Sequence, residues 1–216
     1  LQALGILENF DLSQMEVNSV EAVHIIAEAT RLAFADRNKY AADSNYVNVP
    51  IDELLNRKYL QKRAYIINID YAAPKVTAGN FDLEFSSYQP AIEPPSTTHI
   101  SIVDKQGNAV SMTSSIEFAF GSGLSTRGFI LNNQLTDFSF LPYKNDKKIA
   151  NSIAPGKRPR SSMSPILVFD ENDQLKMVLG SPGGARIIPY VFKSSSSSSY
   201  RVGIICSVSF GSSIFT

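Results

Sequence analysis

The chain has 216 residues, 44% of them hydrophobic, and its 20 basic and 20 acidic residues give a formal net charge of zero. This length suffices for one sizeable core, and the balanced charge without a basic stripe argues against a nucleic-acid partner. No apolar run reaches membrane-spanning length, and the single cysteine, Cys206, excludes an intrachain disulfide and a cysteine-based metal site.

The N-terminal third has the pattern of a helical scaffold. Residues 18–21 have the spacing of a capping box, and apolar residues then recur at helical spacing, which predicts one amphipathic helix over residues 20–40. Further helical segments are expected over residues 50–55 and 59–67. We interpret His24 as a packing or surface residue, because no second His or Cys lies at metal-ligand spacing.

A breaker-rich linker, residues 72–96, follows the helices and is expected to be exposed. Residues 98–104 and 109–115 then have the pattern of a β-hairpin with turn residues between them. We expect the first strand to be buried, with Thr97 at its start. In an antiparallel hairpin the end of the second strand returns to the start of the first, so Ser115 is expected beside Thr97.

Cleavage of the Ser96–Thr97 bond would turn Thr97 into a nucleophile that carries its own base. A threonine hydroxyl hardly ionises at neutral pH, whereas a freed α-amino group titrates at about pH 8 and can accept the hydroxyl proton. The cut is self-made if the Thr97 hydroxyl attacks the Ser96 carbonyl and water hydrolyses the ester. Two other interpretations stay open: Ser96-Thr97-Thr98 is an ordinary loop entering a strand, and Ser115 is an ordinary strand serine.

A Ser/His/Asp triad built on His99 with Asp104 or Asp137 is a further alternative. We expect the His99 side chain to point away from Thr97 on the strand, which disfavours this arrangement.

Several separate motifs follow one another along the chain: Thr97-Thr98-His99 through Asp104, Gly107-Asn108-Ala109-Val110, Phe120-Gly121, Leu131-Asn132-Asn133-Gln134, Asp137-Phe138-Ser139, Lys157-Arg158-Pro159, Ser161-Ser162-Met163-Ser164-Pro165 and Gly180-Ser181-Pro182-Gly183-Gly184. In their order and near-family spacing, these motifs resemble the gamma-glutamyltranspeptidase (glutathione hydrolase) family. The resemblance covers roughly residues 1–193. Residues 1–96 resemble the end of the family's large subunit, and residues 97–193 the start of its small subunit.

The resemblance implies an α+β fold, the four-layer αββα sandwich of the N-terminal-nucleophile hydrolases, incomplete at both ends of this chain. It also implies a precursor that cuts itself before Thr97 into subunits that then pair. The freed threonine would take a gamma-glutamyl group from glutathione or a related amide and pass it to water or to an acceptor amine. No metal or cofactor is implied, and periplasmic or extracellular localisation is expected from the family alone.

The catalytic residues implied by this resemblance are Thr97, Ser115, Gly183 and Gly184. Thr97 is the nucleophile, and Ser115 stands where the family usually has a second threonine that bonds the nucleophile's amine or hydroxyl. Backbone N–H groups of Gly183 and Gly184 would form the oxyanion hole, since glycine lets the backbone approach a reacting carbonyl. Alternatively, the glycine pair starts a helix that binds another anion.

The implied substrate-binding residues are Gln134, Asp137, Ser161, Ser162 and Glu117. Gln134 and Asp137 match residues that hold the substrate α-amino group, and the serine pair matches residues that bond the glutamyl α-carboxylate. Glu117 departs from the family's usual asparagine, and its charge is expected to alter specificity or rate. Taken alone, the Asn132-Asn133-Gln134 segment is better interpreted as a polar turn, and the serine pair as a solvated loop.

Other segments add expectations about the site and the chain ends. The linker 139–155 is short, which indicates an open site, and its lysines are expected to be solvated. Residues 194–216 form an anomalous tail, interpreted as a reading-frame error or truncation, with a serine linker as the alternative. Missing strands would leave apolar surface exposed.

Two other functions stay open. One is a related N-terminal-nucleophile acylase acting on another amide, such as a beta-lactam side chain, and the other is a catalytically silent fragment. The family's carboxylate-binding arginine lies upstream of this chain, so the chain itself is expected to be inactive. Gln134, Asp137 and the serine pair favour the gamma-glutamyl function, because together they would bind an amino-acid head group.

Overall fold

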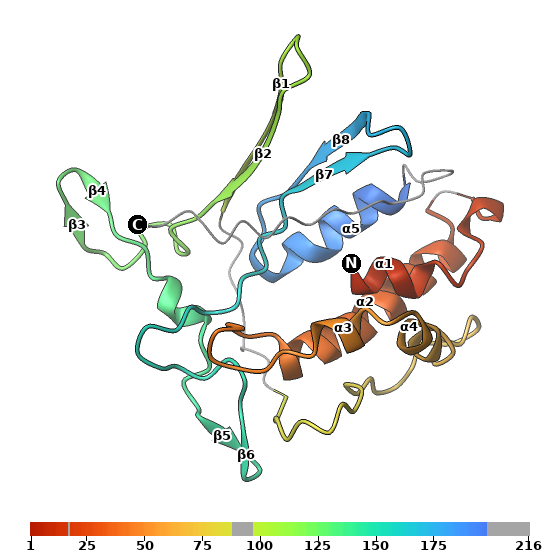
Figure 1. The fold of residues 1–216 in the computed structure, drawn as a ribbon, viewed down its shortest axis with the longest axis horizontal. Helices are drawn as coiled ribbons and strands as arrows, with labels where there is room; N and C mark the ends of the chain where they lie inside the picture. Colours follow the sequence, from red (N-terminus) through yellow and green to blue (C-terminus); the bar gives the residue numbers. More distant parts are fainter. Residues whose placement is uncertain (17, 88–96, 198–216) are drawn as a thin grey trace.

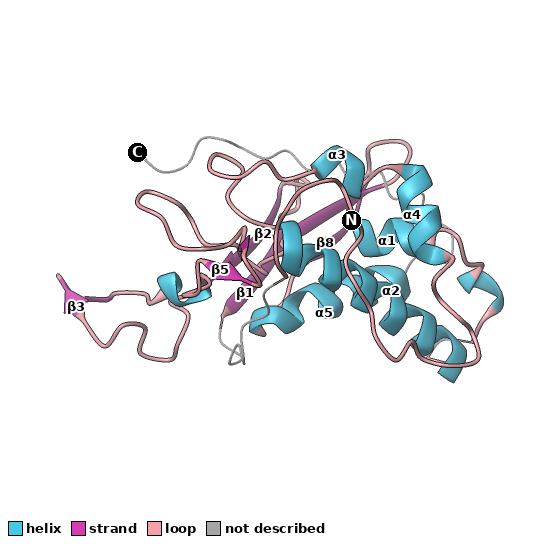
Figure 2. Cartoon of the chain, turned by 90° about the horizontal axis from the view of Figure 1, so that it is seen from below, coloured by secondary structure: helices cyan, strands magenta, loops and turns pink. Residues whose placement is uncertain are grey.

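The computed structural model describes residues 1–16, 18–87 and 97–197, with the helices gathered together and the β-hairpins arranged around them (Figures 1 and 2). The first helices are α1 (Gln2–Leu7), α2 (Val20–Tyr40), α3 (Ile51–Leu54) and α4 (Arg57–Ala64), and α5 (Ile187–Ser197) comes last. The 3₁₀ helices are η1 (Leu12–Gln14), η2 (Gln134–Asp137) and η3 (Gly184–Arg186).

Helix α2 confirms the helix predicted over residues 20–40, but not its cap. The helix begins after Ser19, whose hydroxyl accepts a hydrogen bond from the Ala22 backbone N–H at 3.2 Å. Asn18 lies outside the helix with φ of 62°, so the capping box predicted over residues 18–21 is wrong. Ser19 provides the cap because its hydroxyl reaches a backbone N–H of the first turn directly.

The two shorter helical segments are confirmed with different bounds. Helix α3 matches the segment predicted over residues 50–55. Helix α4 begins two residues before the predicted segment 59–67 and ends three residues before its end. The early start follows from Asn56, whose side chain accepts a hydrogen bond from the Lys58 backbone N–H and caps the helix.

The buried core joins the first and last parts of the described chain. Ile6 of α1, Ile25 and Leu32 of α2, and Leu60 of α4 pack in one apolar cluster with Phe192 of α5. The predicted division at residue 97 therefore does not separate two independent cores. The domain bounds themselves stay a prediction.

Four β-hairpins make up the strand content of the described residues. They are β1 (Thr98–Val103) with β2 (Ala109–Ser114), β3 (Ser125–Thr126) with β4 (Phe129–Ile130), β5 (Tyr143–Lys144) with β6 (Lys147–Lys148), and β7 (Ile166–Phe169) with β8 (Leu175–Leu179). Each is a separate two-stranded antiparallel sheet. The mixture of helices and hairpins agrees with the α+β class.

The β1–β2 hairpin confirms the one predicted from the sequence, with Thr98 opposite Ser114. Asp104 closes its turn by accepting hydrogen bonds from the backbone N–H groups of Gln106 and Asn108. The Ser111 hydroxyl donates to the Leu179 carbonyl at 2.7 Å and ties β2 to β8. The hairpin thus lies beside the β7–β8 pair.

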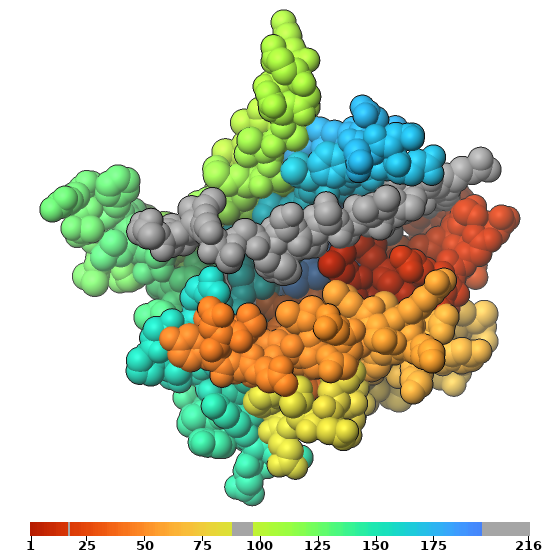
Figure 3. Space-filling model, in the orientation of Figure 1, coloured from red at the N-terminus to blue at the C-terminus, as the bar shows by residue number. Residues whose placement is uncertain are grey.

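The prediction that the first strand is buried is wrong. Ile102 on β1 is 56% exposed and its partner Val110 on β2 is 50% exposed. Figure 3 shows the hairpin projecting from the body of the molecule. No second layer in the described part of the chain covers this apolar face, so it faces solvent.

The linker between the helices and β1 is exposed only in part. Within its described residues, Lys75 is exposed, whereas Gly79 is half-buried because its N–H donates to Asp36 Oδ1 at 2.7 Å and its carbonyl accepts from Tyr40. The remainder of the linker, including Ser96 of the expected cleavage site, lies outside the described residues. In the predicted tail, residues 194–197 continue α5, and residues 198–216 also lie outside the description.

Candidate active site

The register of the β1–β2 hairpin brings two hydroxyls together. Thr97 precedes β1 and Ser115 follows β2, and the Thr97 hydroxyl donates to the Ser115 Oγ at 3.3 Å. Ser115 Oγ also accepts a hydrogen bond from the Glu117 backbone N–H at 2.9 Å, which fixes its position. The predicted proximity of residues 97 and 115 is confirmed.

One pocket gathers the predicted site residues from five separate segments. It is lined by Thr97, Ser115, Glu117, Gln134, Asp137, Arg160, Ser161, Ser162, Met163, Gly184 and Ile187. Of the predicted residues, Gly183 alone is not in this lining, and it is the chain neighbour of Gly184. Residues widely separated in sequence therefore share the pocket that contains the Thr97 side chain.

Gly183 adopts a backbone conformation that suits glycine. Its φ is 134°, which L side chains rarely adopt, and a Cβ built there would lie 3.1 Å from Cε2 of Tyr190. Gly184 begins η3, which runs into α5. The pair therefore precedes a helix, which agrees with either of the two interpretations of these glycines.

Gln134 links the two carboxylates of the pocket. Its Nε2 donates to Glu117 Oε2 at 3.0 Å and to Asp137 Oδ2 at 2.6 Å. Glu117 is buried, with φ of 73°. The two carboxylates and the amide form one wall of the pocket, whose lining also contains the cationic Arg160.

The turn that carries Gln134 is also polar, so both interpretations of this segment apply. The Asn132 side chain accepts a hydrogen bond from the Gln134 N–H, and the Asn133 side chain accepts one from the Phe118 N–H. These bonds shape the chain around η2 and direct Gln134 into the pocket.

The serine pair forms another wall of the pocket and is held by an arginine that was not predicted. Ser162 is buried and Ser161 is exposed, so the solvated-loop interpretation is wrong for Ser162. Arg37 Nη2 donates to the Ser162 Oγ at 2.7 Å and, more weakly, to the Ser161 carbonyl at 3.4 Å. The contact spans 125 positions along the chain, and no local pattern in the sequence predicts it.

The segment before the serine pair is fixed by buried polar groups. Asn151 accepts a hydrogen bond from the Arg160 N–H at 3.0 Å and donates to the Asp137 carbonyl at 2.7 Å, which connects the two walls. The Lys157 ammonium donates to the carbonyls of Ala150 and Ser152. Burial lowers the pKa of Lys157, with a smaller contribution from Lys148.

Asp43 anchors the same segment to the end of α2. Its Oδ2 accepts a hydrogen bond from the Arg158 backbone N–H at 2.9 Å. This bond is the largest of the interactions that hold the pKa of the buried Asp43 carboxyl below its usual value. The lysines of the β5–β6 hairpin are exposed, as expected from the sequence.

The two histidines are engaged elsewhere. His99 contacts the hydroxyls of Thr113 and Ser101 through its two ring nitrogens, both at 2.9 Å. The triad with Asp104 or Asp137 is therefore wrong, because both ring nitrogens already have hydroxyl partners. His24 contacts the Asn68 carbonyl at 2.7 Å, which confirms its packing role. The described residues contain no His, Cys, Asp and Glu cluster that could hold a metal.

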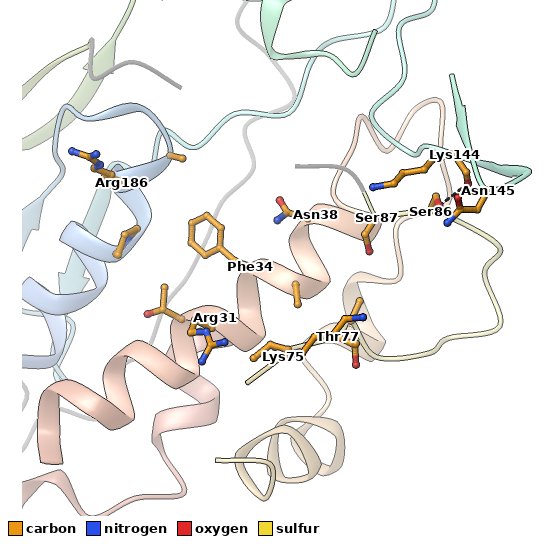
Figure 4. A pocket seen from close by; sticks show the side chains of 16 residues that line it. Arg31, Phe34, Asn38, Lys75, Thr77, Ser86, Ser87, Lys144, Asn145 and Arg186 are labelled. Atoms are coloured by element: carbon orange, nitrogen blue, oxygen red, sulfur yellow. Dashed lines mark hydrogen bonds between the residues drawn. The ribbon is translucent and has the colours of Figure 1, made fainter. Parts of the chain in front are cut away.

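A larger hollow lies elsewhere, between α2, the linker, the β5–β6 hairpin and the start of α5 (Figure 4). Arg31, Lys75, Lys144 and Arg186 line it, and it contains none of the predicted site residues. Arg31 is paired with Glu28, and the other three side chains are exposed. The smaller pocket around Thr97 is therefore the better candidate site.

Comparisons with known proteins agree with the motifs in this pocket. The model of the gamma-glutamyltranspeptidase family matches residues 1–200. A glutathione hydrolase proenzyme of Bacillus subtilis (strain 168) is 40% identical over 203 residues, covering 89% of this chain and 34% of the relative. An ACY 1 acylase proenzyme of Pseudomonas sp. (strain V22) is 37% identical over 190 residues, covering 87% of this chain and 31% of the relative.

Among solved structures, a cephalosporin acylase from Bacillus halodurans has a TM-score of 0.56 and 24% identity. The likeness covers 87% of this chain and 32% of that one, and it concerns the fold alone. The chain spans about a third of the length of the curated relatives it matches. In the described residues, no helix is long and apolar enough to cross a membrane.

Proposed function

The chain belongs to the gamma-glutamyltranspeptidase family, and from that premise we propose that its protein is a gamma-glutamyl hydrolase and transferase acting on glutathione and related gamma-glutamyl amides. The observation that carries the proposal is the pocket around Thr97. Its lining also contains the carboxylates of Glu117 and Asp137 and the Ser161–Ser162 pair. The αββα sandwich, the pairing of subunits and a periplasmic or extracellular site of action are parts of the same proposal.

The nucleophile would be released by self-cleavage before Thr97. Thr97 Oγ1 attacks the Ser96 carbonyl carbon, the peptide C–N bond breaks, and the Thr97 nitrogen leaves as an amine that carries the hydroxyl proton. Water then hydrolyses the ester, giving a Ser96 carboxylate and restoring the hydroxyl. The φ of 114° at Thr97 supports this step, because such a conformation costs a β-branched residue about 1–3 kcal/mol.

Acyl transfer would use the freed amine as the base. Thr97 Oγ1 attacks the γ-carbonyl carbon of the substrate, and its proton passes to the Thr97 amine. The tetrahedral oxyanion accepts hydrogen bonds from the N–H groups of Gly183 and Gly184 until the C–N bond breaks and the leaving amine takes the proton. Water then releases glutamate from the ester, or an acceptor amine forms a new gamma-glutamyl amide.

The two walls of the pocket suit the head group of a gamma-glutamyl compound. The substrate α-ammonium would lie against Asp137 and Glu117, which Gln134 holds together. The α-carboxylate would accept hydrogen bonds from the Ser161 and Ser162 hydroxyls. A zwitterion thus meets complementary partners on each side, and charge-assisted hydrogen bonds are the stronger ones.

The second candidate function is that of an acylase. It would use the same N-terminal nucleophile but cleave amides that carry another acyl group. The relative named as an acylase proenzyme supports it. The carboxylates of Glu117 and Asp137 favour the first candidate, because an acyl group without an amine has no cation to place against them.

Hydrolysis of two anilides by the full-length protein, rather than by this chain alone, tests the proposal. L-gamma-glutamyl-p-nitroanilide carries the α-ammonium, and glutaryl-p-nitroanilide lacks it but is otherwise the same. We expect p-nitroaniline release from the first substrate at a rate at least tenfold above the second. Preference for the glutaryl substrate would favour the acylase, and release from neither would support the catalytically silent alternative.

A further inference from the structure

Arg37 and the 160–162 segment hold one another by side-chain and backbone contacts. Arg37 lies in the last turn of α2, before the proposed cut, and Ser162 lies after it. The guanidinium donates to the Ser162 Oγ at 2.7 Å, and Arg160 Nη1 contacts the Arg37 carbonyl at 3.5 Å. Phe34 supports the guanidinium, whose central carbon is 5.6 Å from the ring centroid.

The chemistry of the two groups fixes the direction of this hydrogen bond. A guanidinium has donors and no acceptor, whereas a hydroxyl has one donor and two acceptor lone pairs. Arg37 therefore occupies a lone pair of the Ser162 Oγ, and the Ser162 proton must point to another acceptor. Ser162 is buried and lines the pocket with Thr97, so an acceptor bound in the pocket is the natural partner.

We propose that Arg37 is a positioning residue that sets the Ser162 hydroxyl as a donor and thereby selects ligands with a free α-carboxylate. This inference rests on the proposed function, since it assigns the carboxylate of the gamma-glutamyl head group to Ser162. The positive charge of Arg37 also polarises the Ser162 O–H group and strengthens its bond to an anion. Arg37 acts through Ser162 and lies outside the pocket lining.

The test compares two probe ligands that differ in the α-carboxylate alone. L-glutamate carries it, and 4-aminobutyrate lacks it but keeps the amine and the γ-carboxylate. Dissociation constants for both are measured by isothermal titration calorimetry on the unaltered chain, R37A, R37K and R57A. Arg57 is an exposed arginine at the start of α4 and serves as the matched control.

We expect the unaltered chain and R57A to bind L-glutamate more tightly than 4-aminobutyrate. In R37A the ratio of the two dissociation constants, 4-aminobutyrate over L-glutamate, should fall about 10- to 100-fold. Binding of 4-aminobutyrate should not change, and R37K should retain part of the preference. Equal weakening of both ligands in R37A, or an unaltered chain without a preference, would overturn the inference.

A double-variant comparison covers the case in which R37A folds poorly. In the S162A background the hydroxyl is absent, so R37K should cause no further loss of preference, whereas in the unaltered chain it should cause one. Equal losses in the two backgrounds would contradict a role through Ser162. Failure of the proposed function is separate, because it would appear as absent anilide release by the full-length protein, whereas this chain would still prefer L-glutamate.

Discussion

The Thr97 hydroxyl donates to the Ser115 hydroxyl across the open end of the β1–β2 hairpin, at 3.3 Å. We expect this bond to orient Thr97 Oγ1 for attack. Ser115→Ala should slow anilide hydrolysis about fivefold, since a neutral hydrogen bond contributes about 1 kcal/mol. Ser115→Thr keeps the hydroxyl and should retain most of the activity. Equal rates for the alanine variant and the unaltered protein would remove Ser115 from the mechanism.

Asp137 is expected to bind the substrate amine. Asp137→Asn should weaken L-glutamate binding about 10- to 100-fold, because a charged partner becomes neutral. Glutarate, which lacks the amine, should bind the variant as well as the unaltered protein or better. Asp146→Asn, an exposed change in the β5–β6 turn, is the control and should change neither. A similar loss for both ligands would indicate damage to the pocket instead.

Gly183 is expected to tolerate no side chain. Gly183→Ala should lower anilide hydrolysis about 100-fold, because its φ of 134° and the Tyr190 ring force a shift of the N–H groups proposed for the oxyanion hole. Gly107→Ala is the matched control: φ there is 87°, but nothing lies within 4 Å of the added Cβ. Similar activity for the two variants would place the oxyanion hole elsewhere.

Asp43 should make stability depend on pH in the acid range. Its pKa is lowered from 3.8 in the folded state, so its contribution is present above pH 4 and is lost as pH falls through the lowered value. Asp43→Asn should reduce the free energy of unfolding at pH 7 by about 1–2 kcal/mol. In urea unfolding series the difference between the two proteins should shrink below pH 4. A difference that stays constant to pH 2 would contradict this assignment.

Elements with local signals could be predicted from the sequence. The α2 helix and the β1–β2 hairpin follow from apolar spacing and turn residues that lie within each segment. The hairpin register in turn predicted that Ser115 lies beside Thr97. The start of α4 was missed, because the Asn56 cap outweighs the apolar pattern that begins later.

Contacts between distant segments could not be predicted in this way. From the sequence alone, Arg37 has the pattern of an exposed polar residue on a helix. Its hydrogen bond to Ser162 depends on how α2 packs against the 160–162 segment. The burial of β1 was wrongly predicted, because alternation in a strand does not tell whether another layer covers it. Phe192 joins the core of the first helices through tertiary packing alone.

The central claim is that Thr97 becomes an N-terminal nucleophile, and mass spectrometry of the purified chain tests it most directly. We predict two fragments that separate between Ser96 and Thr97, slower cutting in Thr97→Ser, which keeps a hydroxyl, and an intact chain in Thr97→Ala. An unaltered chain that stays whole on prolonged incubation, or a Thr97→Ala chain cut at the same bond, would contradict it.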